Sequence, residues 1–268
     1  MTTSDTTTPP RTVSREITLD APTPAVWRAL TEAGELTRWF AEYARVSPGP
    51  GGSIWMKWNG IYEAESSVEA WEPERHLRIV FPVHGPVRLA TDYHLESAGG
   101  STVLRVVTSG FGQGTDWNEW FDGVSTGWDF ELRSLQHYLE RHRGQNRVTL
   151  SLRGSYVSSA REAWHRLVGA KGWLRFDEAP VEGSSYRARA LPGLALSGRV
   201  IQWLSPRQVV LTVDQVNDGL MRLELERGNV AVLWLAAWGV ETEQVRELEK
   251  EWRESFLAAL AYDVRRKT

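Results

Sequence analysis

The stretch Ala25-Val26-Trp27-Arg28-Ala29-Leu30 decides the fold, because a similar stretch, Glu162-Ala163-Trp164-His165-Arg166-Leu167, follows it in the second half of the chain. Leu30 and Leu167 are 137 positions apart. Other landmarks recur in the same order at ever smaller separations: Gly60 and Gly193 at 133, Trp71 and Trp203 at 132, Leu104 and Leu233 at 129, Gly112 and Gly239 at 127, Trp128 and Trp252 at 124. Because loops tolerate deletions better than strands do, this pattern indicates a tandem duplication whose second copy has shorter loops.

Hydrophobic periodicity predicts the elements around the first stretch. Before it, Val13, Ile17 and Leu19 lie on one side of an alternating pattern, which is typical of a strand with one apolar face. After it we expect a short helix near residues 36–40, then an antiparallel meander with strands at residues 54–58, 61–71, 77–81, 89–95 and 103–108. Asn59-Gly60 predicts a type I′ hairpin between the first two strands.

A long amphipathic helix is predicted to close the first copy. Apolar residues recur there at steps of three and four, and they are Trp117, Trp120, Phe121, Val124, Trp128, Leu132, Leu135 and Tyr138. Gly123 and Gly127 interrupt this stripe, and each costs about 1 kcal/mol of helix stability relative to Ala. We expect them to mark a kink or a break between two helices.

This order of elements resembles that of the START/SRPBCC (Bet v1-like) superfamily, and the first copy resembles its activator of Hsp90 ATPase homologue-like branch. The resemblance covers residues 13–143 and is distributed rather than a catalytic signature. Its pieces are Arg15-Glu16-Ile17, Ala25-Val26-Trp27-Arg28-Ala29-Leu30-Thr31, Leu36-Thr37-Arg38-Trp39-Phe40, the Pro/Gly break before Ile54, Val68-Glu69-Ala70-Trp71-Glu72-Pro73 with Leu77, and Gly127-Trp128 ahead of Leu132 and Leu135.

The resemblance implies an α+β fold with two helix-grip (START-like) domains. Each would have a curved antiparallel sheet wrapped around a long C-terminal helix, together with two short helices. We expect a disordered leader at residues 1–12, a first domain at residues 13–144 and a second, degenerate domain at residues 147–263. The second copy offers only Gly172-Trp173-Leu174-Arg175-Phe176 opposite residues 36–40, and it has no counterpart to Trp55 and Trp58.

Composition excludes several classes of protein. The net charge of −3 and the pI near 6.1 provide no basic surface for nucleic acid. The chain has no cysteine, which excludes disulfides and thiolate chemistry. We recognise neither a signal peptide nor a membrane-spanning stretch, so we expect a soluble cytoplasmic protein that binds neither nucleic acid nor membrane.

The 14 tryptophans of the chain suggest a ligand cavity. Eight of them lie in the first copy, and so many large rings are difficult to pack densely in one small domain. Members of the superfamily mostly bind hydrophobic small molecules between sheet and helix, so the resemblance implies a cavity of this kind. We expect the ligand-binding residues to be Trp39, Trp55, Trp58, Trp117, Trp120, Phe121 and Trp128.

Catalytic patterns are weak. No metal site is expected, because the histidines lack ligand spacing and His137 and His142, five apart, should diverge on a helix. No phosphate loop or dinucleotide fingerprint is present, so we expect no cofactor. The candidates for acid–base chemistry are His94 and Asp92, which share one face of a predicted strand.

Three functions remain open. The first is the binding or sequestration of a hydrophobic or aromatic small molecule in the first domain, in metabolite resistance or transport, without catalysis. The second is a polyketide cyclase/aromatase-like or hydrolytic enzyme. The third is a protein-interaction or co-chaperone-like module, in which the fused copies form a monomeric pseudo-dimer or a weak homodimer.

Overall fold

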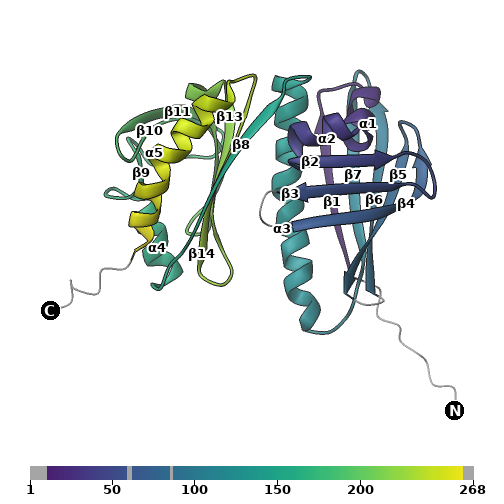
Figure 1. Cartoon of the computed structure of the whole chain (residues 1–268), viewed down its shortest axis with the longest axis horizontal. Helices are drawn as coiled ribbons and strands as arrows, with labels where there is room; N and C mark the ends of the chain where they lie inside the picture. Colours follow the sequence, from purple (N-terminus) through teal and green to yellow (C-terminus); the bar gives the residue numbers. More distant parts are fainter. Residues whose placement is uncertain (1–10, 59–61, 85–86, 262–268) are drawn as a thin grey trace, which may run out of the picture. The chain divides into compact units, whose positions relative to one another are not determined.

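The computed structural model describes residues 11–58, 62–84 and 87–261. The chain divides between Gly144 and Gln145 into two compact units, called here the first and second domains (Figure 1). The first strand begins at Arg11, two residues before the expected start of the first domain. Residues 1–10 of the expected leader lie outside the described residues.

The first domain has the predicted order of elements. These are β1 (Arg11–Leu19), α1 (Thr23–Thr31), α2 (Ala33–Trp39), β2 (Tyr43–Ser47), β3 (Ser53–Trp58), β4 (Tyr62–Glu72), β5 (His76–His84), β6 (Val87–Ala98), β7 (Ser101–Phe111), α3 (Asp116–His137) and a π-helical turn, η1 (Tyr138–His142). Strand β2 was not predicted. The predicted turn at Asn59-Gly60 lies outside the described residues, and the strands on its two sides pair with Trp58 opposite Tyr62.

The second domain repeats the order of the seven strands and of the first and last α-helices. Its elements are β8 (Arg147–Ser155), α4 (Ala160–Leu167), β9 (Leu174–Phe176), β10 (Ser185–Ala190), β11 (Leu194–Leu204), β12 (Gln208–Val213), a 3-10 turn η2 (Asp214–Val216), β13 (Gly219–Glu226), β14 (Val230–Trp238) and α5 (Thr242–Leu260). The expectation of two short α-helices is wrong here, because the segment at residues 172–176 forms a turn and then strand β9.

The two sheets have the same topology, so the chain is a tandem duplication of one α+β fold. The first sheet has the order β1-β7-β6-β5-β4-β3-β2, the second has β8-β14-β13-β12-β11-β10-β9, and all neighbours in both are antiparallel. An edge-to-face tryptophan pair also recurs. Trp27 meets Trp71 at 5.4 Å between ring centroids, and the equivalent Trp164 meets Trp203 at 5.9 Å.

Local sequence explains how the helices after the first strands begin. Helix α1 begins after Pro22 and carries a proline in its first turn, where the missing N–H costs no hydrogen bond. Helix α4 begins with a capping box, in which the Ser159 side chain accepts from the Glu162 backbone and the Glu162 side chain accepts from the Ser159 backbone.

Helix α3 is continuous from Asp116 to His137, so of the expected kink or break at Gly123 and Gly127, the break is wrong. Packing of the apolar stripe against the sheet outweighs the propensity cost of two glycines. The expectation that His137 and His142 diverge is also wrong. The π-helical turn between them places residues five apart on one side, and their ring centroids are 5.0 Å apart.

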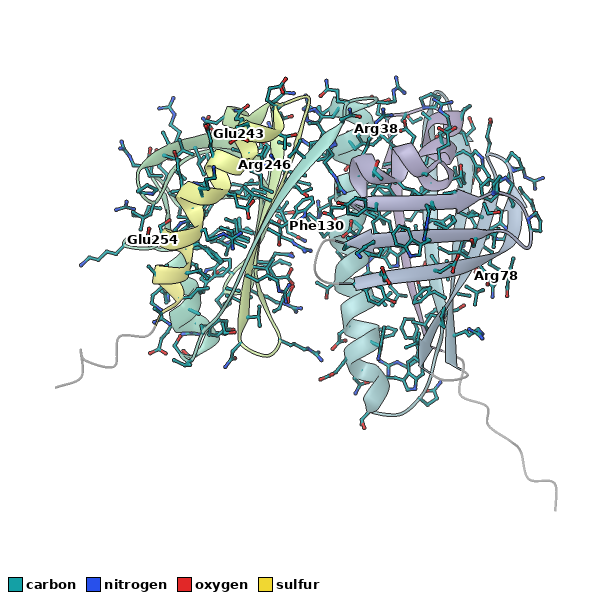
Figure 2. The ribbon with its side chains drawn as sticks, in the orientation of Figure 1. Arg38, Arg78, Phe130, Glu243, Arg246 and Glu254 are labelled. Atoms are coloured by element: carbon teal, nitrogen blue, oxygen red, sulfur yellow. The ribbon has the colours of Figure 1, made fainter. Side chains whose placement is uncertain are left out.

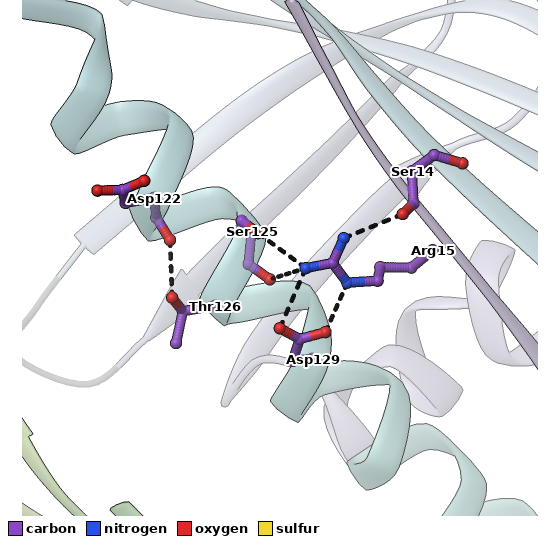
Figure 3. A network of polar contacts seen from close by, with 6 residues as sticks. All are labelled: Ser14, Arg15, Asp122, Ser125, Thr126 and Asp129. Atoms are coloured by element: carbon purple, nitrogen blue, oxygen red, sulfur yellow. Dashed lines mark hydrogen bonds and ion pairs between the residues drawn. The ribbon is translucent and has the colours of Figure 1, made fainter. Parts of the chain in front are cut away.

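A polar clamp joins β1 to α3 (Figure 3). Arg15 forms a two-pronged ion pair with Asp129, in which Nε donates to Oδ1 and Nη2 to Oδ2, the latter at 3.1 Å. Nη2 also donates to the Ser125 hydroxyl at 2.8 Å. The hydrogen bond with Asp129 raises the pKa of Arg15. Arg15 points toward the helix because it shares a strand face with Val13 and Leu19, which are buried.

The core of the second domain contains a cluster of three packed aromatic side chains. Trp173 meets Trp252 edge to face at 5.2 Å and Phe256 at 5.8 Å, and all three rings are fully buried. The opposite side of α5 carries Glu243, Arg246 and Glu254, which are exposed (Figure 2).

In the described part of the chain, no helix is both long enough and apolar enough to cross a bilayer.

Candidate ligand-binding site

A cavity of about 200 Å³ lies in the first domain, where the concave face of the sheet meets α3. It is lined by Phe40, Met56, Trp58, Tyr62, Ala64, Ser66, Ile79, Phe81, Thr91, Tyr93, Thr108, Val124, Gly127, Trp128 and Glu131. Its wall is mostly apolar and aromatic, as is typical of small-molecule sites. An apolar cavity of about 150 Å³ suffices to hold benzene, so this one has room for an aromatic ring with substituents.

Strand alternation and register bring the sheet side of the wall together. Ile79 on β5 pairs with Thr91 on β6, and Thr91 pairs with Thr108 on β7, so the three side chains form one row across the sheet. Met56 and Ala64 form a similar pair on β3 and β4. Because side chains alternate between faces along a strand, the residues between these positions point to the other side of the sheet.

Phe40 connects the aromatic rings of the wall. It follows α2 and lies 5.2 Å from Trp58 and 6.1 Å from Trp128, measured between ring centroids. The Trp58 indole also donates to the Phe40 carbonyl at 3.0 Å. This hydrogen bond fixes the orientation of Trp58, so the rings present a preformed surface to a ligand.

Hydroxyl groups supply the polar part of the site. The Trp128 indole donates to the Thr108 hydroxyl at 3.0 Å, and the Thr108 and Thr91 hydroxyls form a hydrogen bond with each other at 3.0 Å. The Thr91 hydroxyl keeps further hydrogen-bonding capacity toward the cavity. Glu131 on α3 adds a half-buried carboxylate to the wall.

Tyr93 contributes a hydroxyl that is available to a ligand. The residue is 5% exposed and its ring meets Trp128 edge to face at 5.8 Å. Within the described residues, its hydroxyl has no hydrogen-bond partner. Burial raises the pKa of Tyr93 far above its usual value, so the hydroxyl stays protonated and can both donate and accept.

Two of the seven predicted ligand-binding residues, Trp58 and Trp128, line this cavity. Trp39 lies one layer behind, fully buried and stacked on Phe40 at 4.7 Å, with its indole donating to the Ala29 carbonyl at 2.8 Å. Trp55 alternates with Met56 and therefore lies on the outer face of the sheet, where the Arg45 guanidinium covers its ring at 4.1 Å.

The other three predicted residues lie near the start of α3, outside the cavity lining. Trp117 and Phe121 meet Phe111 at 6.2 and 5.2 Å between ring centroids, in a separate aromatic cluster. Trp120 is 43% exposed. The apolar stripe predicts which face of α3 is buried. It does not predict which turns of the helix border the cavity.

His94 and Asp92 lie on the outer face of the sheet, away from the cavity. Tyr93, between them, faces the cavity, so strand alternation sends both neighbours to the other side. Asp92 contacts His76 and Arg78 there. Partial burial, with His76 and Arg105 nearby, lowers the pKa of His94. An acid–base pair of His94 and Asp92 therefore cannot act on a molecule held in the cavity.

Sequence reasoning missed Phe40, Tyr93, Thr91 and Thr108 as site residues. The alternation of β6 did separate Tyr93 from Asp92 and His94, but the sequence pattern did not show which face was concave. Knowledge of the strand register would have identified the row of Ile79, Thr91 and Thr108.

Residues 20–140 match the family model described as activator of Hsp90 ATPase homolog 1-like protein. No protein of curated function matches the chain. Among solved structures, protein MLL2253 from Mesorhizobium loti is 24% identical over 48% of this chain and 97% of its own, with a TM-score of 0.45. DynU16, from the dynemicin biosynthetic locus, is 19% identical over 94% of this chain and 97% of its own (TM-score 0.44). BexL, a di-domain ARO/CYC protein of the BE-7585A biosynthetic pathway, is 16% identical over 93% and 97% (TM-score 0.44).

Proposed function

We propose, for a chain whose residues 20–140 match the activator of Hsp90 ATPase homolog 1-like family model, that the first domain binds a small aromatic molecule between its sheet and α3. Binding without a chemical step fits the sequestration or transport of a metabolite. The site is formed by Phe40, Trp58, Trp128 and Tyr93, with Thr91 as a further polar contact.

The observation that carries this proposal is an apolar cavity bordered by the hydroxyl of a buried tyrosine, Tyr93, which has no hydrogen-bond partner among the described residues. A ligand with a hydroxyl or carbonyl group can form a hydrogen bond with the Tyr93 hydroxyl, and one such bond contributes about 0.5–1.5 kcal/mol net. The wall therefore favours an aromatic ligand with one polar substituent over a plain hydrocarbon.

The cavity volume fits a ligand of one or two rings. At about 200 Å³ it is only slightly larger than a space that holds benzene. A compound with more rings would extend out of the cavity. Phenols and naphthols are accordingly the first probes to test, and the tryptophan fluorescence of Trp58 and Trp128 should report their binding.

Two glycines of α3 offer a matched pair of variants. A Cβ atom built at Gly127 or at Gly123 meets nothing within 4 Å, and Gly127 lines the cavity whereas Gly123 is exposed. Both substitutions to Leu replace a helix-interior glycine, so both should stabilise the helix by about 1 kcal/mol. We expect Gly127→Leu to fill the cavity and abolish naphthol binding, and Gly123→Leu to bind as the wild type does.

Isothermal titration calorimetry with 2-naphthol measures both variants directly. Equal affinity in the wild type and Gly127→Leu would place the ligand elsewhere and refute the site. A wild type that binds no member of a panel of substituted phenols and naphthols would refute the proposed ligand class.

A reaction in the same cavity is the second candidate, because Glu131 and Tyr93 both line it. A carboxylate and a protonated tyrosine are suitable as a general base and a general acid. Mass spectrometry of each bound compound after incubation distinguishes the two functions, since a binding protein returns its ligand unchanged.

A further inference from the structure

A row of charged and imidazole side chains crosses the outer face of the first sheet. His76 on β5 pairs directly with His94 on β6, Glu72 on β4 pairs with His76, and Arg105 on β7 pairs with His94. Directly opposed side chains on one face have Cβ atoms about 4.5–5.5 Å apart. The proposed ligand cavity lies on the opposite face, so this row belongs to a different site.

The two histidines and Asp92 form a compact group within the row. The imidazole rings of His76 and His94 are parallel and their centroids are 4.5 Å apart. His76 Nε2 lies 2.8 Å from Asp92 Oδ1. One possible ligand atom from each of the three residues lies within 4.8 Å of the others. All three side chains are partly exposed, so an ion can reach them from solvent.

We propose that His76, His94 and Asp92 bind a divalent transition-metal ion, with zinc as the representative ion. Two imidazoles and a carboxylate are a common ligand set for zinc and suit the borderline metals of the first transition row. Binding requires the two rings to turn out of their stack, so that a nitrogen of each points at the ion. Water then completes the coordination on the solvent side.

Acidic groups slightly outnumber basic ones beside the two histidines. His76 and His94 border a surface groove that Glu16, Glu72 and Glu96 also line, together with Arg75 and Arg105. The carboxylate of Asp92 is held in place by Arg78, which also contacts Glu69 and extends from the side of the sheet away from α3 (Figure 2). Carboxylates that bind metals in proteins are themselves commonly hydrogen-bonded in this way.

The test is a calorimetric titration of the full chain with zinc chloride, after removal of metal with a chelator. We expect one zinc per chain at this site. His76→Ala and His94→Ala should each weaken binding by at least about 100-fold, because loss of an outer partner alone costs about 10- to 100-fold. Asp92→Asn should weaken it by about 10-fold or more. Circular dichroism checks that each variant is folded.

Two control variants separate this site from other histidines. His165→Ala removes an exposed histidine of α4, and His137→Ala removes one ring of the pair beside the π-helical turn. Both should leave the zinc affinity of the His76 and His94 site unchanged. In the wild type, NMR signals of the His76 and His94 rings should shift on addition of zinc. Absence of zinc binding, unshifted ring signals, or full binding in a His76→Ala/His94→Ala double variant would overturn the proposal.

Discussion

Tyr93 is the residue of the first domain that offers a ligand the clearest polar contact. A tyrosine hydroxyl that is buried usually has a partner, and that of Tyr93 has none among the residues described. The neighbouring hydroxyls of Thr91 and Thr108 already hydrogen-bond to each other, so each has less capacity left for a ligand. Tyr93 is therefore the polar group from which a ligand would gain most.

Replacing Tyr93 with Phe should weaken binding of a naphthol by about 5-fold, which corresponds to the ~1 kcal/mol of one net hydrogen bond. Binding of naphthalene, which has no polar substituent, should stay the same and serves as the control. Because burial raises the pKa of Tyr93, the wild-type affinity for a neutral ligand should be constant between about pH 6 and pH 9. Calorimetry at several pH values measures both effects, and an unchanged naphthol affinity in Tyr93→Phe would exclude the hydroxyl as a contact.

At the scale of elements, α3 contains residues of low helix propensity but packs well against the sheet. Gly123 and Gly127 both lie inside a helix that has no break. Leu132, Leu135 and Trp128 are buried on its sheet side, and this burial stabilises the helix more than two glycines destabilise it. The glycine at position 127 also leaves open the space that forms part of the cavity.

Gly123→Ala should raise the free energy of unfolding of the first domain by about 1 kcal/mol, because alanine has the higher helix propensity and its Cβ meets no neighbour. Urea denaturation followed by circular dichroism measures the change. A fall in stability would mean that the helix bends at this position in solution. Ligand affinity should not change, since Gly123 does not line the cavity.

At the scale of the whole molecule, the two domains share one sheet topology but differ in how side chains fill the space between sheet and helix. The first domain leaves a cavity beside Trp128. In the second, the equivalent Trp252 is fully buried and packs on Trp173, which in turn meets Phe256. The duplicated fold therefore combines a domain built around a cavity with one whose corresponding tryptophan belongs to a packed core.

Trp252→Ala should destabilise the second domain by about 3–5 kcal/mol, the usual cost of deleting a large aromatic side chain from a core. The affinity of the first domain for a naphthol should remain that of the wild type, because the proposed site contains no residue of the second domain. Urea denaturation and calorimetry on the full chain provide the two measurements. Loss of ligand binding at a urea concentration where the first domain is folded would contradict this assignment.

Only part of the candidate site could be predicted from the sequence. The sequence identified Trp58 and Trp128 among its candidates, but it also included Trp55, Trp117 and Trp120, which do not line the cavity. The number of aromatic residues shows that the fold must accommodate many large rings. It does not show which of them line a cavity. For the histidines, helical spacing was the wrong criterion, because His76 and His94 meet through strand pairing and His137 and His142 through a π-helical turn.

The sequence by itself determined the duplication, the order of the elements and the alternation that separates Tyr93 from Asp92 and His94. These features depend on local periodicity and on repeated landmarks, which a linear chain displays directly. Only the tertiary structure decided which strand face is concave, which turns of α3 border the cavity and which histidines pair across strands. Those outcomes depend on register and packing between segments far apart in the chain, and no local pattern contains them.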